Sequence, residues 1–148
     1  MFSFQIINHP ESFSLDHVRI ADIFQCVAEM GDIPQKGILN IAFLSDSEIQ
    51  ALNSQYRKKD TTTDVLSFHY FEDFSDISED DIAGEIILSE SQIILQSTEE
   101  NHSLEKECEV LVIHSILHII GYDHETDEDY QAMWKVEKPI REKFGLHV

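Results

Sequence analysis

Long apolar runs are missing from this sequence of 148 residues, and cysteine is scarce. A transmembrane helix needs about 20 consecutive apolar residues, whereas the longest apolar stretches here are short and are interrupted by charged residues or histidine. The amino-terminal segment also lacks the basic start and the small-residue cleavage site of a secretory signal. We therefore expect no membrane association and a cytoplasmic location.

The two cysteines, Cys26 and Cys108, lie far apart in the sequence, each within a helical pattern. Disulfide bonds form mainly in secreted proteins, and no secretory signal is evident. We therefore expect two buried free thiols rather than a disulfide bond.

Basic residues are also few, because ten Lys and Arg stand against 29 Asp and Glu and give a formal net charge of -19. Such a charge argues against a general, sequence-independent attraction to nucleic acids or anionic membranes. An anionic substrate would therefore need a local basic site. Arg57, Lys58 and Lys59 are consecutive, and no further basic residue follows until Lys106.

Apolar periodicity predicts an α+β fold in a single domain, residues 1–148, with a four-stranded mixed sheet and about five helices. Ser45 with Glu48, and Ser89 with Gln92, have the spacing of capping boxes, and Thr126 is the cap of a last helix. We expect polar loops at 57–63 and 72–81. The expected strands are 1–8, 38–44, 65–71 and 83–88, and the expected helices are 15–30, 46–53, 90–98, 104–120 and one from 127 that ends near 145.

The most informative segment contains three histidines in the pattern His-x-x-x-His-x-x-Gly-x-x-His. His114 and His118, four residues apart, share one helix face and can reach a single zinc ion at about 2.0 to 2.1 Å. Gly121 can end the helix and fold the chain back, which brings His124 to the same ion. Three ligands leave a fourth position for water, whose pKa falls to about 7 on zinc, so the pattern predicts a catalytic zinc site.

Chance proximity of the histidines is one alternative, but this spacing is expected by chance only about 0.02 times in a chain of this composition. Metzincin proteases share the spacing and have a Glu after the first His as general base. Here that position is Ser115. Loss of a general base costs about 10² to 10⁴ in rate, so a protease is the lesser interpretation.

Three segments of the sequence, in this order and spacing, resemble the YbeY family of endoribonucleases and ribosomal-RNA maturation factors. They are Asn53–Asp60 with Thr63–Phe68, Gly84–Ile87, and Leu111–His124, within a resemblance that covers about residues 40–140. The resemblance implies one zinc ion on the three histidines and a single-stranded RNA substrate. It also implies a role in small-subunit ribosomal RNA end processing and ribosome quality control, with the ribosome or small-subunit assembly proteins as partners.

Arg57 matches the position where the family places a basic residue beside the metal. We expect its planar set of donors to bind the substrate phosphate while zinc activates water and polarises the phosphoryl oxygen. The alternative is an ordinary exposed loop arginine. Asp64 and Asp123 could each accept a hydrogen bond from a ligand histidine, but a role as cap or turn residue is the open alternative.

The sequence departs from the usual family pattern at three positions. The family usually has Gly where this chain has Ser115, Pro where it has His69, and often Asp where it has Glu85. None of these is a predicted metal ligand, so the site prediction is unaffected. Two other classes remain open: a non-enzymatic, zinc-containing ribosome-assembly factor and, less favoured, a metalloprotease-like hydrolase. The basic run at 57–59 favours phosphate chemistry over both.

Overall fold

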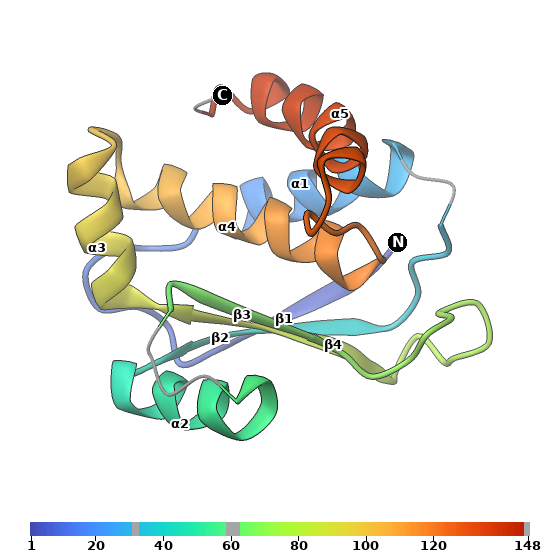
Figure 1. Cartoon of the computed structure of the whole chain (residues 1–148), viewed down its shortest axis with the longest axis horizontal. Helices are drawn as coiled ribbons and strands as arrows, with labels where there is room; N and C mark the ends of the chain where they lie inside the picture. Colours follow the sequence, from blue (N-terminus) through green and yellow to red (C-terminus); the bar gives the residue numbers. More distant parts are fainter. Residues whose placement is uncertain (31–32, 59–62, 147–148) are drawn as a thin grey trace.

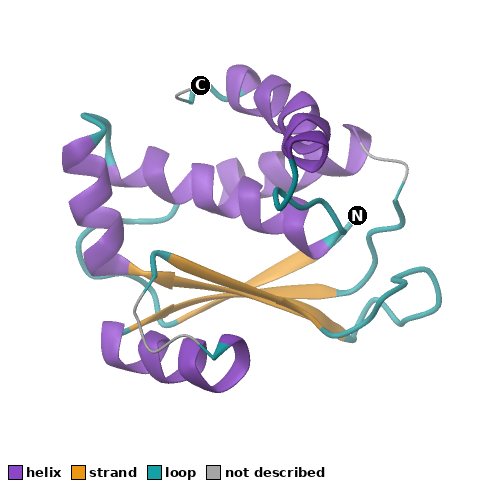
Figure 2. Ribbon diagram, in the orientation of Figure 1, coloured by secondary structure: helices purple, strands orange, loops and turns teal. Residues whose placement is uncertain are grey.

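A mixed sheet of four strands, with helices on both faces, forms the framework of the protein in a computed structural model that describes residues 1–30, 33–58 and 63–146 (Figures 1 and 2). The predicted α+β class, four strands and five helices are confirmed. The elements along the chain are β1 (Ser3–Ile7), α1 (His17–Met30), β2 (Ile38–Leu44), α2 (Asp46–Arg57), β3 (Val65–His69), β4 (Ile82–Ser89), α3 (Glu90–Glu99), α4 (Leu104–Ile119) and α5 (Asp127–Lys143).

The strands lie in the order β1-β2-β4-β3. Strands β1, β2 and β4 run parallel to one another, and β3 runs antiparallel to β4. Most residues of β2 and β4 are buried, as expected for central parallel strands that are covered on both faces. Strand β3 lies at the edge of the sheet. A cleft beside β3 therefore leaves the buried central strands covered.

Helices α1 and α4 lie on one face of the sheet, and α5 packs against both of them on the side away from the strands (Figure 1). The main apolar core fills the space between the sheet and these helices. Helix α2 covers the opposite face over a smaller core of Ile49, Leu66 and Ile87. The polypeptide thus places α4 directly above β3, which is the arrangement on which the site depends.

Helix α2 begins as predicted but is longer than predicted. The Ser45 hydroxyl accepts a hydrogen bond from the Glu48 N–H (3.2 Å), and the Ser45 N–H donates to the Glu48 carboxylate (3.3 Å), which forms the capping box. The helix continues to Arg57, where the sequence predicted a loop, and ends at Lys58 in the left-handed conformation. Residues 54–56 are exposed, so the apolar period gave no signal for this last turn.

Strand β3 ends at His69, two residues before the predicted end at Phe71. The Tyr70 N–H still donates to the Ala83 carbonyl (2.9 Å), but the chain then turns into the acidic segment 72–81. That segment forms a loop, as predicted.

Both cysteines are buried free thiols, as predicted. Burial, with the neighbouring glutamates of α4, raises the pKa of Cys108 to about 12, so this thiol stays protonated and unreactive. None of the described helices is long and apolar enough to cross a membrane.

Candidate active site

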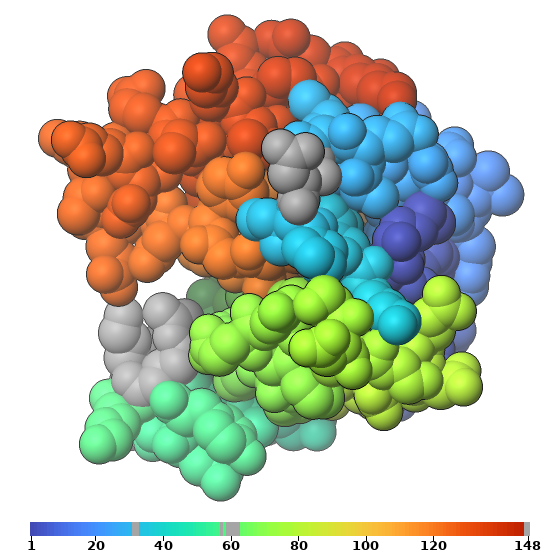
Figure 3. Space-filling view, turned by 90° about the vertical axis from the view of Figure 1, so that its right-hand side faces the viewer, coloured from blue at the N-terminus to red at the C-terminus, as the bar shows by residue number. Residues whose placement is uncertain are grey.

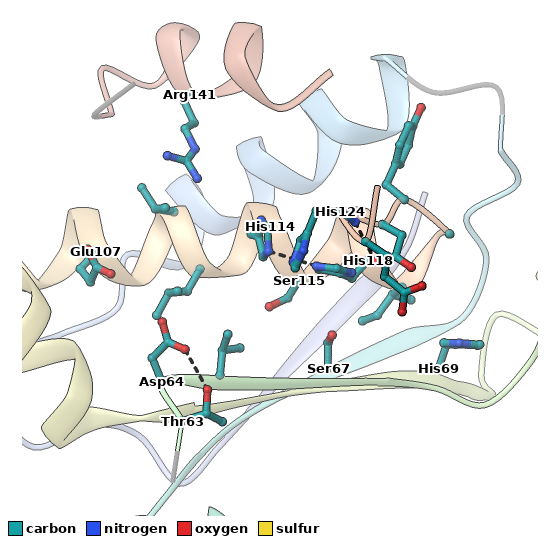
Figure 4. Close-up of a pocket in the computed structure, with 18 of the residues that line it drawn as sticks. Thr63, Asp64, Ser67, His69, Glu107, His114, Ser115, His118, His124 and Arg141 are labelled. Carbon is teal, nitrogen blue, oxygen red and sulfur yellow. Dashed lines mark hydrogen bonds between the residues drawn. The ribbon is translucent and has the colours of Figure 1, made fainter. Parts of the chain in front are cut away.

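Two of the three predicted ligands lie on the last turns of α4, on the face that looks toward β3 (Figure 4). The helix ends after Ile119, and Gly121 adopts a φ of 115°, a conformation that residues other than glycine rarely adopt. The Tyr122 N–H donates to the Leu117 carbonyl (3.0 Å), which closes the helix end. The chain therefore reverses at the predicted glycine and brings His124 back beside α4.

The three imidazoles of His114, His118 and His124 converge. Their ring centroids are 4.6, 4.9 and 5.6 Å apart, and one nitrogen from each ring lies within 4.8 Å of the other two. The Nε2 atoms of His114 and His118 are 3.0 Å apart. Two nitrogens bound tetrahedrally to zinc at about 2.1 Å are roughly 3.4 Å apart, so this donor set fits one metal ion.

His118 has the electrostatic environment of a neutral ligand. Burial lowers its pKa below the ordinary value of 6.5, and the neighbouring His114 and His124 lower it further, against the opposing effect of Asp123 and Glu137. A metal binds only the neutral form of imidazole. The lowered pKa therefore keeps this ligand ready at neutral pH.

Glu137 of α5 fixes the orientation of the first histidine. Its carboxylate accepts a hydrogen bond from His114 Nδ1 (2.8 Å) and forms an ion pair with Arg141 (2.6 Å). Burial alone would raise the pKa of Glu137, but the bond from His114 and the charge of Arg141 outweigh burial and lower it. The carboxylate is therefore ionised, so the proton sits on Nδ1 of His114 and the lone pair on Nε2 faces the cluster.

The cluster lines a cleft of about 910 Å³ between α4 and β3 (Figure 4). The cleft is bordered by Asp64, Ser67 and His69 on the strand side and by residues from Glu107 to Glu125 on the helix side. Figure 3 shows the hollow between the segment around 115–125 and the segment around 65–75, with the end of α2 below it. The three histidines are thus reached from solvent through this cleft.

The described lining of the cleft is acidic. It contains four carboxylates, against Arg141 as the basic residue among the described lining, and Arg141 is already paired with Glu137. The four are Asp64, Glu107, Asp123 and Glu125. Within the described lining, a metal ion held by the three histidines would therefore be the main positive charge available to an anionic ligand.

The other residues singled out in the sequence have the following places. Arg57 is the last residue of α2, and its side chain lies outside the described part of the structure, as does Lys59. Asp64 accepts a hydrogen bond from Thr63 Oγ1 (3.1 Å), and Asp123 accepts one from the His124 backbone N–H (2.7 Å). These bonds are typical of turn residues, which was the alternative interpretation for both aspartates.

Glu137, whose carboxylate contacts a histidine of the cluster, was not predicted from the sequence. A signal for it existed, because Glu137 lies on the buried stripe of α5 with Met133 and Ile140. An ionisable side chain on an apolar stripe needs a buried partner. The identity of that partner could not be predicted, because it depends on how α5 packs against α4.

The comparisons with known proteins agree with this geometry. The family model of endoribonuclease YbeY matches residues 5–145. Endoribonuclease YbeY of Finegoldia magna is 36% identical over 148 residues, which cover 97% of this chain and 94% of the relative. The Clostridioides difficile relative of the same name is 40% identical over 110 residues, 73% of this chain and 72% of the relative. The solution structure of TM1509 from Thermotoga maritima superposes with a TM-score of 0.55 at 27% identity and covers 95% of this chain and 91% of that one.

An α+β fold with three converging histidines in an open cleft defines a class of enzymes with a site for one metal ion. Within that class, the full-length family match and relatives above 30% identity decide the group. The chain belongs to the endoribonuclease YbeY family. The protease interpretation is therefore set aside, and the enzyme class is that of a family acting on RNA.

Proposed function

We propose that this protein is a zinc-dependent, single-strand-specific endoribonuclease of the cytoplasm that processes the ends of small-subunit ribosomal RNA and takes part in ribosome quality control. The supporting observation is the cluster of His114, His118 and His124, whose ligand nitrogens lie within 4.8 Å of one another in a cleft of about 910 Å³. The ribosome and small-subunit assembly proteins are the proposed partners.

The roles of the protein groups follow from their geometry. His114, His118 and His124 would hold one zinc ion, which when bound supplies a Lewis acid and lowers the pKa of water to about 7. Glu137 keeps Nε2 of His114 free of a proton. We assign Arg57 to the phosphate, because it is the last residue of α2, matches the basic position of the family, and carries a guanidinium that binds phosphate with two parallel hydrogen bonds.

The decisive experiment is cleavage of a small-subunit ribosomal RNA fragment by zinc-loaded protein, compared with His114→Ala and Arg57→Ala. We expect the wild type to cut and both variants to lose at least about 100-fold in rate, the usual loss when a group that stabilises transition-state charge is removed. Circular dichroism and thermal unfolding establish that the variants are folded. A duplex of the same sequence tests single-strand specificity and should remain uncut.

The alternative of a non-enzymatic assembly factor gives the opposite result. Wild type and both variants would then show the same trace of cleavage, which marks a contaminating nuclease. In that case the protein would still bind zinc. A strain that carries Arg57→Ala would assemble ribosomes as well as the wild-type strain does.

A further inference from the structure

An acidic protein that acts on RNA needs a source of affinity other than charge. The net charge is -19, and the described lining of the cleft has four carboxylates. The consecutive basic residues at 57–59 can neutralise at most three phosphates. Stacking of bases on aromatic rings is the other main source of affinity for single strands, and it does not depend on the charge of the protein.

Exposed aromatic side chains gather on the far side of strand β3 from the cleft. Tyr56, near the end of α2, is 61% exposed, and Tyr70, just after β3, is 54% exposed. Side chains alternate between the two faces of a strand. Ser67 and His69 therefore border the cleft, whereas Phe68 packs against the smaller core under α2. Tyr70 follows the end of β3 and lies near Glu85 and Tyr56.

Tyr56 lies near both Phe68 and Tyr70, and we call these three residues the aromatic patch. The rings of Tyr56 and Phe68 meet edge to face with centroids 5.5 Å apart, which fixes the orientation of the exposed Tyr56 ring. Burial raises the pKa of Tyr70, and so do the adjacent Glu85 and Tyr56, so its phenol is neutral. The rings are thus held by neighbours on one side and open to solvent on the other.

The patch has basic neighbours in the sequence after Tyr56 and the carboxylate of Glu85 beside Tyr70. Arg57 and Lys58 follow Tyr56 directly, and Lys58 is exposed. The end of α2 lies below the hollow that opens the cleft (Figure 3). A strand of RNA that crosses the three histidines and leaves over the β3 edge would therefore meet basic residues and aromatic rings together.

We propose that the aromatic patch is a base-stacking site, at which Tyr56 and Tyr70 hold a nucleotide that flanks the scissile bond of a single-stranded RNA. This inference rests on the proposed function for the identity of the cleaved polymer. It adds a binding site outside the cleft, and it explains how an acidic protein retains a single strand. It also favours unpaired RNA, because a base inside a duplex has no free face to stack.

The test is binding of a fluorescently labelled twelve-nucleotide oligoadenylate RNA, measured by anisotropy with a chelator present to prevent cleavage. We expect Tyr56→Ala and Tyr70→Ala each to weaken binding by about 5- to 100-fold, the usual loss for one stacked base. Tyr56→Phe and Tyr70→Phe keep the ring and should bind like the wild type. Leu95→Ala, at an exposed position on α3, is the control for loss of apolar surface.

Two further measurements separate stacking from charge. The loss for Tyr56→Ala should be the same factor at low and high salt, whereas the loss for Lys58→Ala should shrink as salt rises. In a series of oligonucleotides with one abasic position each, one position should weaken binding to the wild type but leave binding to the Tyr56→Ala variant unchanged. That pattern would show that the base at this position stacks on the ring of Tyr56.

The proposal is overturned if Tyr56→Ala and Tyr70→Ala bind the oligonucleotide as the wild type does, or if the Phe variants lose as much as the Ala variants. Equal binding of all the abasic oligonucleotides would also overturn it. Failure of the proposed function is distinguishable, because it appears as absence of cleavage by the zinc-loaded wild type. Binding through Tyr56 can persist without cleavage, and cleavage dependent on His114 can persist without stacking.

Discussion

Glu137 on α5 holds the ring of His114 on α4 through a hydrogen bond of 2.8 Å between Oε1 and Nδ1. The two residues are 23 positions apart, and Glu137 is only 3% exposed. Because Arg141 pairs with the other carboxylate oxygen at 2.6 Å, the whole contact is anchored within α5. Packing of the carboxyl-terminal helix therefore determines the orientation of a histidine in the candidate metal site.

The first prediction follows from this contact. Glu137→Gln preserves the size of the side chain but removes its negative charge. That charge makes Nε2 of His114 a stronger electron-pair donor to a metal ion. We expect the affinity for zinc to fall by about 10- to 100-fold, which is typical when the carboxylate behind a ligand histidine is lost. Competition with a chromophoric chelator measures this directly.

Glu142→Gln is the matched control, since Glu142 lies on the same helix with a side chain that is 55% exposed. It should leave the affinity for zinc unchanged. Equal affinities of the wild type and Glu137→Gln would show that the hydrogen bond has no influence on the metal site.

The second prediction concerns pH and the metal-free protein. The pKa of His118 is lower in the folded state than its ordinary value of 6.5, chiefly through burial. As pH falls, the unfolded chain therefore takes up this proton before the folded chain does. The corresponding stability is present above about pH 6.5 and is lost as pH falls below that value.

Denaturant unfolding of wild type and His118→Asn in a chelator, across this range, isolates the effect. The free energy of unfolding of the wild type should fall more steeply below about pH 6.5 than that of the variant, because the variant cannot take up the proton. A constant difference between the two proteins at all pH values would contradict the assigned shift.

The convergence of the three histidines could be predicted from the sequence because their geometry is local. Positions 114 and 118 share a helix face whatever the rest of the fold does, and Gly121 signals the turn that returns His124. Glu137 could not be predicted as a partner, because only the packing of two helices brings it to His114. The acidic cleft could not be predicted either, since Glu107 and Asp64 come from different elements and meet only in the fold.

The third prediction uses an unusual feature of α4. Ser115 is 1% exposed, and its hydroxyl has no hydrogen-bond partner among the described residues. A buried hydroxyl without a partner costs about 1–3 kcal/mol. Ser115→Ala should therefore raise the free energy of unfolding by about 1 kcal/mol, with the affinity for zinc unchanged.

Ser97→Ala is the comparison, because Ser97 is also a buried helix serine but donates to the Ile94 carbonyl at 2.9 Å. It should not gain stability in the same way. If Ser115→Ala instead lowers the melting temperature as much as Ser97→Ala does, the hydroxyl has a partner that stabilises the fold.

The last prediction concerns two glycines that are required for different reasons. A Cβ at Gly84 of β4 would lie 2.3 Å from the Phe68 carbonyl oxygen of β3, and that backbone cannot move without shifting the strand that borders the cleft. We expect Gly84→Ala to lower the free energy of unfolding by about 1–3 kcal/mol through overpacking.

A Cβ at Gly121 would meet nothing within 4 Å, so Gly121→Ala is opposed only by the φ of 115°. Its backbone adjustment should displace His124 and weaken zinc binding more than Gly84→Ala does. Thermal unfolding and zinc titration of both variants test this, and the reverse order of zinc affinities would show that β3, rather than the turn, determines the position of the third ligand.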